Sequence, residues 1–213
     1  MLHGGALTDG ALEMRRRDDG SVQLAGRFPY GKAAILSDGG RTGRPRKERF
    51  ASRAFEYRVN RPDEEIHLLL GHDFDRPLAS KLNRTMTLKD GAAALTFEAI
   101  ITRAIAETSY GRDALAMIGA GLAIGLSPGF RIPPERAVAD AEEIEQEADD
   151  GTLDEQGHPR RGAIIRTIKA ALLYELSIVT RPAYDEATVE MRNWDCARII
   201  PVKPRIHATA RWR

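Results

Sequence analysis

The sequence predicts a mainly β fold with flanking helices (β+α), arranged as a small barrel or a sandwich with the helices packed outside. Three observations indicate this fold. Several short segments alternate apolar and polar residues, which is the period of a half-buried strand. Turn residues such as Gly, Pro and Asp separate these segments. Only one stretch has clear helical spacing, and many strands with one or two helices are typical of a small barrel or sandwich.

Four segments in the N-terminal half have the pattern of strands. They are residues 22–28, 66–70, 82–88 and 92–101. Asp90 and Gly91 lie between the last two of these segments. Because an Asp-Gly pair between two alternating runs is the strongest short-range signal for a hairpin, we expect these two strands to pair.

The C-terminal half supplies one short helix and three further strands. Residues 110–119 place Leu115 and Ile118 at helical spacing and end at glycines, which suits a helix of about three turns. Three extended segments follow, and Pro182 ends the last one. They are residues 122–132, 163–169 and 172–180.

The 213 residues fit one folded domain between two loosely held ends. We expect a flexible N-terminal segment at residues 1–21, a folded domain at residues 22–192 and a loosely held tail at residues 193–213. Hydrophobic residues make up 42% of the chain, which is enough for a core. Neither a disordered nor a fibrous protein is therefore expected.

Two charged blocks interrupt this pattern. Residues 135–158 contain ten acidic residues and one basic residue, with few large apolar side chains. Because such a segment cannot bury an apolar face, we predict a solvated loop or frayed helix inserted into the domain, and docking against a basic partner is the alternative. Residues 41–53 are basic and contain Gly43 and Pro45, so we predict a solvated loop there rather than a nucleic-acid patch.

Composition argues against several classes of function. The formal net charge of +1 gives no overall field for nucleic acid. The single cysteine, Cys196, excludes an internal disulfide framework, favours a reducing compartment, and lies in polar sequence unsuited to a thiol nucleophile. We see neither an apolar run of about 20 residues nor the apolar core of a secretory signal. His67 and His72 have too few companions for a zinc site, so no metal or cofactor is expected.

Three polar residues embedded in apolar, strand-like sequence are candidates for chemistry. His72 ends an apolar run and is either a general base or a structural histidine; Asp73 would point to the opposite face of a strand. Ser127 lies among glycines that let its Oγ be exposed, or it forms a Ser-Pro turn. Glu175 either faces solvent or pairs with a donor such as a histidine N–H. Ser177 shares a strand face with Glu175 but lacks the glycine setting.

In order along the chain, LLLGHDF, the Asp-Gly hairpin, GLSPGF and LYELSIVTRPAYDEA resemble the prohead serine proteases of tailed bacteriophages. That family is distantly similar to the herpesvirus assemblins. The resemblance spans roughly residues 26–192. Each motif alone is only moderately specific, but the three that carry His72, Ser127 and Glu175 are strongly specific in this order.

The resemblance implies a small assemblin-like β-barrel surrounded by a few helices, and a Ser-His-Glu catalytic triad. In it His72 matches the general base, Ser127 the nucleophile and Glu175 the acidic member. The chain departs from the family pattern at Pro128, which has no backbone N–H to offer an oxyanion. The amide of Gly129, another loop amide, or the side chain of Arg131 or Arg181 must serve there instead.

The resemblance also implies the task and its setting. A serine endopeptidase of this family cuts the scaffolding segment from the major capsid protein, and commonly itself, inside the immature prohead in the bacterial host cytoplasm. The assemblin relatives pair, which leaves a homodimer open, whereas neither a membrane nor nucleic acid is an expected partner. The rival hypothesis is a capsid-assembly or scaffolding module that keeps the protease fold without turnover, and Pro128 is the feature in its favour.

Overall fold

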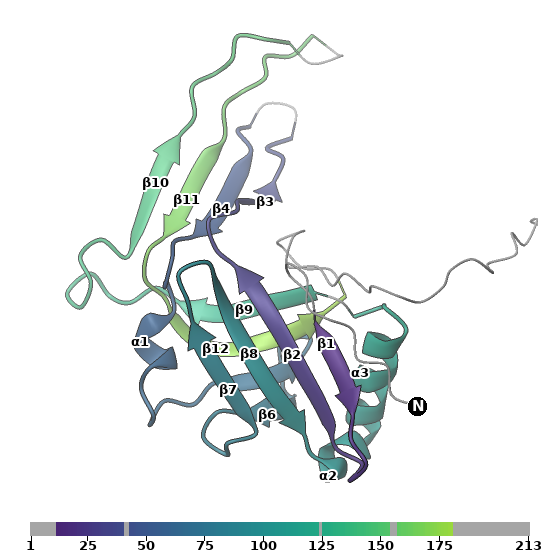
Figure 1. Ribbon diagram of the computed structural model, residues 1–213. Helices are drawn as coiled ribbons and strands as arrows, with labels where there is room; N and C mark the ends of the chain where they lie inside the picture. The colour runs from purple at the N-terminus through teal and green to yellow at the C-terminus, as the bar shows by residue number, and fades with distance from the viewer. Residues whose placement is uncertain (1–11, 41–42, 124, 154–156, 181–213) are drawn as a thin grey trace, which may run out of the picture.

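The strands form three separate four-stranded sheets in the computed structural model, which describes residues 12–40, 43–123, 125–153 and 157–180 (Figure 1). The mainly β fold with few helices is thereby confirmed. The barrel is wrong for the described residues, because each sheet is open and keeps two edge strands of its own. The predicted C-terminal tail, residues 193–213, lies outside the described residues.

The first sheet is antiparallel and has the order β1-β2-β8-β7. Its strands are β1 (Glu13–Arg16), β2 (Val22–Pro29), β8 (Ala94–Ile101) and β7 (Met86–Asp90). Along β2, buried and half-buried residues alternate, as the period of its sequence predicts. β7 and β8 pair around Asp90 and Gly91, which confirms the hairpin. β1 lies inside the N-terminal segment expected to be flexible, and it pairs with β2 from Glu13 to Arg16.

The second sheet has the order β6-β5-β12-β9 and is mixed. Its strands are β5 (His67–Leu70), β6 (Asp73–Ser80), β9 (Gly125–Arg131) and β12 (Leu172–Val179). β12 runs parallel to β5 and antiparallel to β9. Because the two central strands are covered on both faces, they are nearly continuous apolar runs, and a polar side chain within them needs a local partner.

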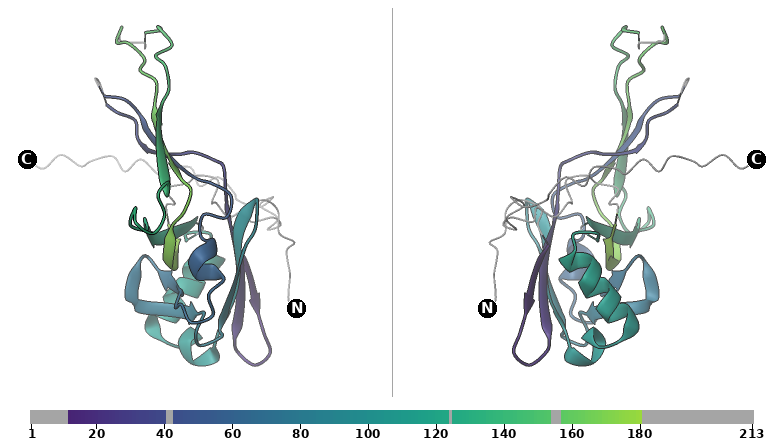
Figure 2. Two further views of the ribbon diagram at one scale, coloured as in Figure 1. Left: turned by 90° about the vertical axis from the view of Figure 1, so that its left-hand side faces the viewer. Right: turned by 90° about the vertical axis from the view of Figure 1, so that its right-hand side faces the viewer.

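The third sheet forms an arm that stands away from the other two sheets, as Figure 2 shows. Its order is β10-β11-β4-β3, with β10 (Glu142–Gln146), β11 (Ile164–Ile168), β4 (Arg46–Phe50) and β3 (Ala34–Ser37). The charged blocks 41–53 and 135–158 therefore contain strands, and the predictions of a solvated loop or frayed helix are wrong for these parts.

Ion pairs between neighbouring strands stabilise the sheet of the arm. Arg166 on β11 contacts Glu48 on β4 at 3.1 Å and Glu142 on β10 at 2.5 Å. Lys169 contacts Glu143 at 2.8 Å. Cross-strand pairs of opposite charge stabilise a sheet without burying an apolar face, so every residue of β10 is exposed and the strand still forms.

Three short helices complete the described part of the chain. They are α1 (Glu56–Val59), α2 (Arg103–Ala106) and α3 (Ser109–Gly119), the last of which confirms the predicted helix. Thr108 caps α3 by accepting a hydrogen bond from the Gly111 N–H. No helix among the described residues is long and apolar enough to cross a membrane.

An aromatic cluster joins the three sheets at the root of the arm. Phe50 on β4 lies with ring-centroid distances of 5.4 Å to Phe28 on β2 and 5.0 Å to Phe130 on β9. Phe55, just before α1, lies 4.9 Å from Phe50. Aromatic pairs at these distances add stability beyond the area they bury. The cluster therefore ties the base of the arm to the sheet that carries β9.

Candidate active site

His72 lies in a two-residue hairpin loop between β5 and β6, not on a strand as its sequence pattern suggested. Leu70 pairs with Asp73, which leaves Gly71 and His72 as the loop. Both have a positive φ, 66° and 62°, which is the pattern of a type I′ turn. Glycine adopts this conformation freely, whereas a histidine in it carries roughly 1–3 kcal/mol of strain. The surrounding structure must therefore hold His72 in place.

Two hydrogen bonds fasten this loop to β12. The Gly71 N–H donates to the Ile178 carbonyl at 3.0 Å. The His72 N–H donates to the Oγ of Ser177 at 2.8 Å. The loop that carries His72 is thus attached to the same strand that carries Glu175.

Glu175 is buried and hydrogen-bonded through both carboxylate oxygens. Its side chain is 4% exposed. Oε1 lies 2.7 Å from Nδ1 of His72, and Oε2 accepts a hydrogen bond from Ser177 Oγ at 2.7 Å. The alternative in which Glu175 faces solvent is therefore wrong. Because a carboxylate accepts, Nδ1 carries the proton of a neutral His72, and Nε2 is the nitrogen that can take up a proton.

Gly129 gives the Glu175 carboxylate its space. The two residues are register partners in β9 and β12. A Cβ at residue 129 would lie 1.9 Å from Glu175 Oε1, far inside any real contact. Only glycine therefore fits opposite Glu175 while the carboxylate lies over β9 toward His72.

Ser127 lies on the same sheet face as this pair. It is the register partner of Ser177, and Gly129 is the partner of Glu175. Cross-strand partners point to one side of a sheet, and residues two apart on a strand do the same. Ser127 is half-buried, whereas Ser177 is fully buried. Of these two serines, Ser127 is the one that a substrate can reach.

Pro128 is compatible with its position because β9 is an edge strand of its sheet. Proline is tolerated on an edge, where one side of the strand has no ladder to complete. Of the other oxyanion candidates, Arg131 is exposed at the end of β9, and its guanidinium lies 5.5 Å from the ring centroid of Tyr174. Arg181 lies outside the described residues.

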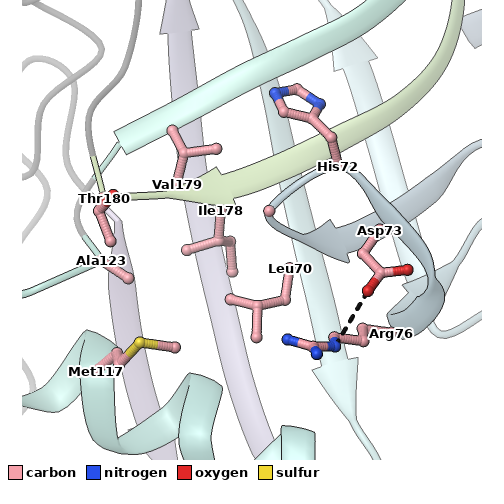
Figure 3. Close-up of a pocket in the computed structure, with 10 residues that line it drawn as sticks. Leu70, His72, Asp73, Arg76, Met117, Ala123, Ile178, Val179 and Thr180 are labelled. Carbon is pink, nitrogen blue, oxygen red and sulfur yellow. Dashed lines mark ion pairs between the residues drawn. The ribbon is translucent and has the colours of Figure 1, made fainter.

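A cavity of about 470 Å³ lies beside His72 (Figure 3). Its lining is mostly apolar, and Figure 3 shows the His72 ring turned away from it. An ion pair of Asp73 and Arg76, 3.1 Å apart, also lines it. Asp73 thus pairs with a cation of its own strand rather than orienting His72. The apolar residues are Leu70, Met117, Ala123, Ile178 and Val179.

Sequence reasoning missed the two hydrogen bonds of the Ser177 hydroxyl. The period of the strand placed its side chain beside Glu175, but the loop that brings the His72 N–H onto its Oγ is a tertiary feature. His67 is the register partner of Glu175, and its ring packs edge-on against Phe74. Among the described residues no three His, Cys, Asp or Glu side chains gather as a metal site would require.

Comparison with known proteins gives a match to a family model. The model of the caudovirus prohead serine proteases matches residues 40–199 of this chain. Neither the curated proteins nor the solved structures include a significant match. The matched range contains His72, Ser127 and Glu175, together with three of the four strands of the arm, β4, β10 and β11.

Proposed function

Because the chain belongs to the caudovirus prohead serine protease family, we propose that His72, Ser127 and Glu175 are the catalytic triad of its capsid-maturation activity. The observation that carries this proposal is the 2.7 Å contact between His72 Nδ1 and a Glu175 carboxylate buried to 4% exposure. A buried carboxylate on Nδ1 fixes the tautomer that leaves Nε2 as a base. Ser127 supplies the reachable hydroxyl on the same face.

In the proposed reaction, His72 Nε2 takes the proton of Ser127 Oγ while Oγ attacks a peptide carbonyl carbon. Glu175 stabilises the imidazolium that forms and keeps its own charge. The imidazolium then gives its proton to the leaving amine as the C–N bond breaks, and an acyl-enzyme remains. Water, deprotonated by the same histidine, hydrolyses the ester and restores Ser127.

The oxyanion of the tetrahedral intermediate needs donors that Pro128 does not supply. We propose a backbone amide for this role, with Gly129 the first candidate because it lies on β9 two residues from Ser127. Arg131 and Arg181 are the side-chain alternatives. The position of Arg131 over Tyr174 gives that arginine a separate structural role, which favours an amide.

The substrate proposed is the scaffolding segment of the major capsid protein inside the immature prohead, followed by cleavage of the protease itself. The test is to co-express the wild-type chain or Ser127→Ala with the major capsid protein of the same genome. Intact masses are then compared after shell assembly. We expect the capsid protein to lose a segment only with the wild type, because Ser127→Ala has no nucleophile.

The same experiment tests the rival function. If shells form with both proteins and neither sample is cut, the chain acts as an assembly module without turnover. Cutting at the wild-type rate by Ser127→Ala would contradict the triad while leaving the protease activity in place. The mass lost in the wild-type sample also identifies the cleavage site.

A further inference from the structure

We infer that Ser177 is a positioning residue that joins the His72 main chain to the Glu175 carboxylate, an inference that rests on the proposed function. Ser177 lies on β12 two residues after Glu175 and has no exposed surface. Its Oγ is an acceptor on one side and a donor on the other. The Ser177 hydroxyl thus fixes both the position of the His72 main chain and the orientation of the Glu175 carboxylate.

The acceptor side acts on the loop. The His72 N–H donates to Ser177 Oγ at 2.8 Å while His72 holds a φ of 62°. A non-glycine residue in this left-handed region persists only where its surroundings hold it. The neighbouring bond from the Gly71 N–H goes to a main-chain carbonyl, so the His72 N–H bond is the only one of these two that depends on a side chain.

The donor side acts on the carboxylate. Ser177 Oγ donates to Glu175 Oε2 at 2.7 Å, which leaves Oε1 for His72 Nδ1 at the same distance. With one oxygen held by Ser177, the carboxylate cannot turn about its terminal bond without losing a hydrogen bond. A buried charge that loses a donor also incurs a desolvation cost, so Glu175 would shift to recover one.

Ser177 is unsuited to be the nucleophile itself. Its hydroxyl proton points to Glu175 rather than to an imidazole nitrogen, since His72 approaches Oγ with its main-chain N–H. A fully buried oxygen is also closed to a peptide carbonyl. Ser127, the register partner of Ser177, is partly exposed and is therefore open to a peptide carbonyl.

Ser177→Ala tests this inference, with Ser80→Ala as the matched control. Ser80 is another buried serine of the same sheet, and it too donates to a glutamate, Glu65 Oε2 at 3.2 Å, and accepts from a main-chain N–H, that of Asn83 at 3.3 Å. The substrate is a peptide spanning the cleavage site found by intact mass. We expect Ser177→Ala to lower kcat by roughly 10–100-fold with KM unchanged, as for residues that orient a catalytic group.

Two further readouts separate positioning from plain stability. The low-field proton NMR signal of the His72 Nδ1–H reports its hydrogen bond to a carboxylate, and it should shift or vanish in Ser177→Ala but stay in Ser80→Ala. In a Glu175→Gln background, adding Ser177→Ala should lower kcat little further, because the two side chains act as a unit. If Ser177→Ala does not fold, Ser177→Cys keeps the site filled with a weaker donor. For Ser177→Cys we expect a loss of kcat smaller than the one given above for Ser177→Ala, together with a shift of the His72 Nδ1–H signal.

The outcomes distinguish this inference from the proposed function. A wild-type kcat and NMR signal in the folded Ser177 variants, with Ser127→Ala inactive, would overturn the positioning role alone. An equal loss of kcat in Ser80→Ala would overturn it as well, because the effect would then be general. Activity of Ser127→Ala would instead overturn the proposed triad.

Discussion

At the residue scale, hydrogen bonds and steric contacts fix the positions of a few groups in the site. Glu175 accepts from two donors, and the strained main chain of His72 is held by its hydrogen bond to Ser177. Residue 129 is a glycine because a side chain there would meet the Glu175 carboxylate. A buried carboxylate next to an imidazole is costly unless both are hydrogen-bonded. Here both oxygens of Glu175 have a hydrogen-bond partner, which offsets the cost of burying this carboxylate.

Gly129→Ala should displace the Glu175 carboxylate, because the new Cβ would meet Oε1 at 1.9 Å. A displacement of about 1 Å costs on the order of 100-fold in rate, so we expect a loss of that size in kcat. Cleavage of the capsid-protein peptide measures it. The matched control is Gly119→Ala, since nothing lies nearer than 3.5 Å to a Cβ at residue 119.

The fold of Gly129→Ala should survive, and its circular dichroism spectrum should match that of the wild type. Unchanged kcat in a folded Gly129→Ala would mean that the carboxylate need not lie over β9. Such a result would remove the steric reason for a glycine opposite Glu175.

At the element scale, the β7–β8 hairpin is linked to its surroundings through Asp90. Tyr30 Oη donates to Asp90 Oδ1 at 2.5 Å, and the Phe55 N–H donates to Oδ2 at 3.1 Å. These bonds connect β2, the hairpin and the start of α1. Burial, the largest cause, raises the pKa of the Asp90 carboxyl above its usual range, and the two hydrogen bonds only partly oppose it.

The raised pKa of Asp90 sets the sign of a pH effect. The folded chain binds this proton more tightly than the unfolded chain, whose aspartate pKa is near 3.8. The stabilisation from Asp90 is therefore fully present below that pKa and is lost as the pH rises through the higher folded pKa. We expect the free energy of unfolding of the wild type, relative to Asp90→Asn, to fall over this window.

Urea unfolding at a series of pH values measures this difference, and Asp113→Asn, whose carboxyl lies at an exposed position of α3, is the control. A difference between wild type and Asp90→Asn that stays flat, or rises with pH, would contradict the burial effect on Asp90.

Tyr30→Phe removes the phenol donor to Asp90 and should lower the free energy of unfolding by about 1–3 kcal/mol, which urea unfolding also measures.

The elements also show what sequence patterns can and cannot predict. The periods of β2, β8, β12 and α3 were sufficient because each element buries one face or a continuous apolar run. β10 was missed because its stability comes from partners such as Arg166, more than 20 residues away along the chain. A local window records its charges but not the opposite charges across the sheet.

At the scale of the whole molecule, three open sheets meet at one aromatic cluster, and one of them, the arm, extends away from the other two (Figure 1). The barrel was wrong because a strand period marks a single strand and does not identify the strands with which it pairs. The residue patterns singled out His72 and Glu175 separately, and the family resemblance linked them; pairing of β5 with β12 brings them into contact. The type I′ loop depends on the pairing of β5 with β6, and the hydrogen bonds of Ser177 depend on where that loop lies beside β12. The sequence pattern could predict neither of them.

The measurement that tests the triad most directly is covalent labelling of the purified chain with a fluorophosphonate, followed by peptide mapping. The phosphonyl group bonds to the serine oxygen that an adjacent base activates, with loss of fluoride. We predict one adduct, on Ser127, and a loss of that adduct in His72→Ala. An adduct on Ser177, or equal labelling of Ser127 with and without His72, would contradict the assignment of His72, Ser127 and Glu175 as the catalytic triad.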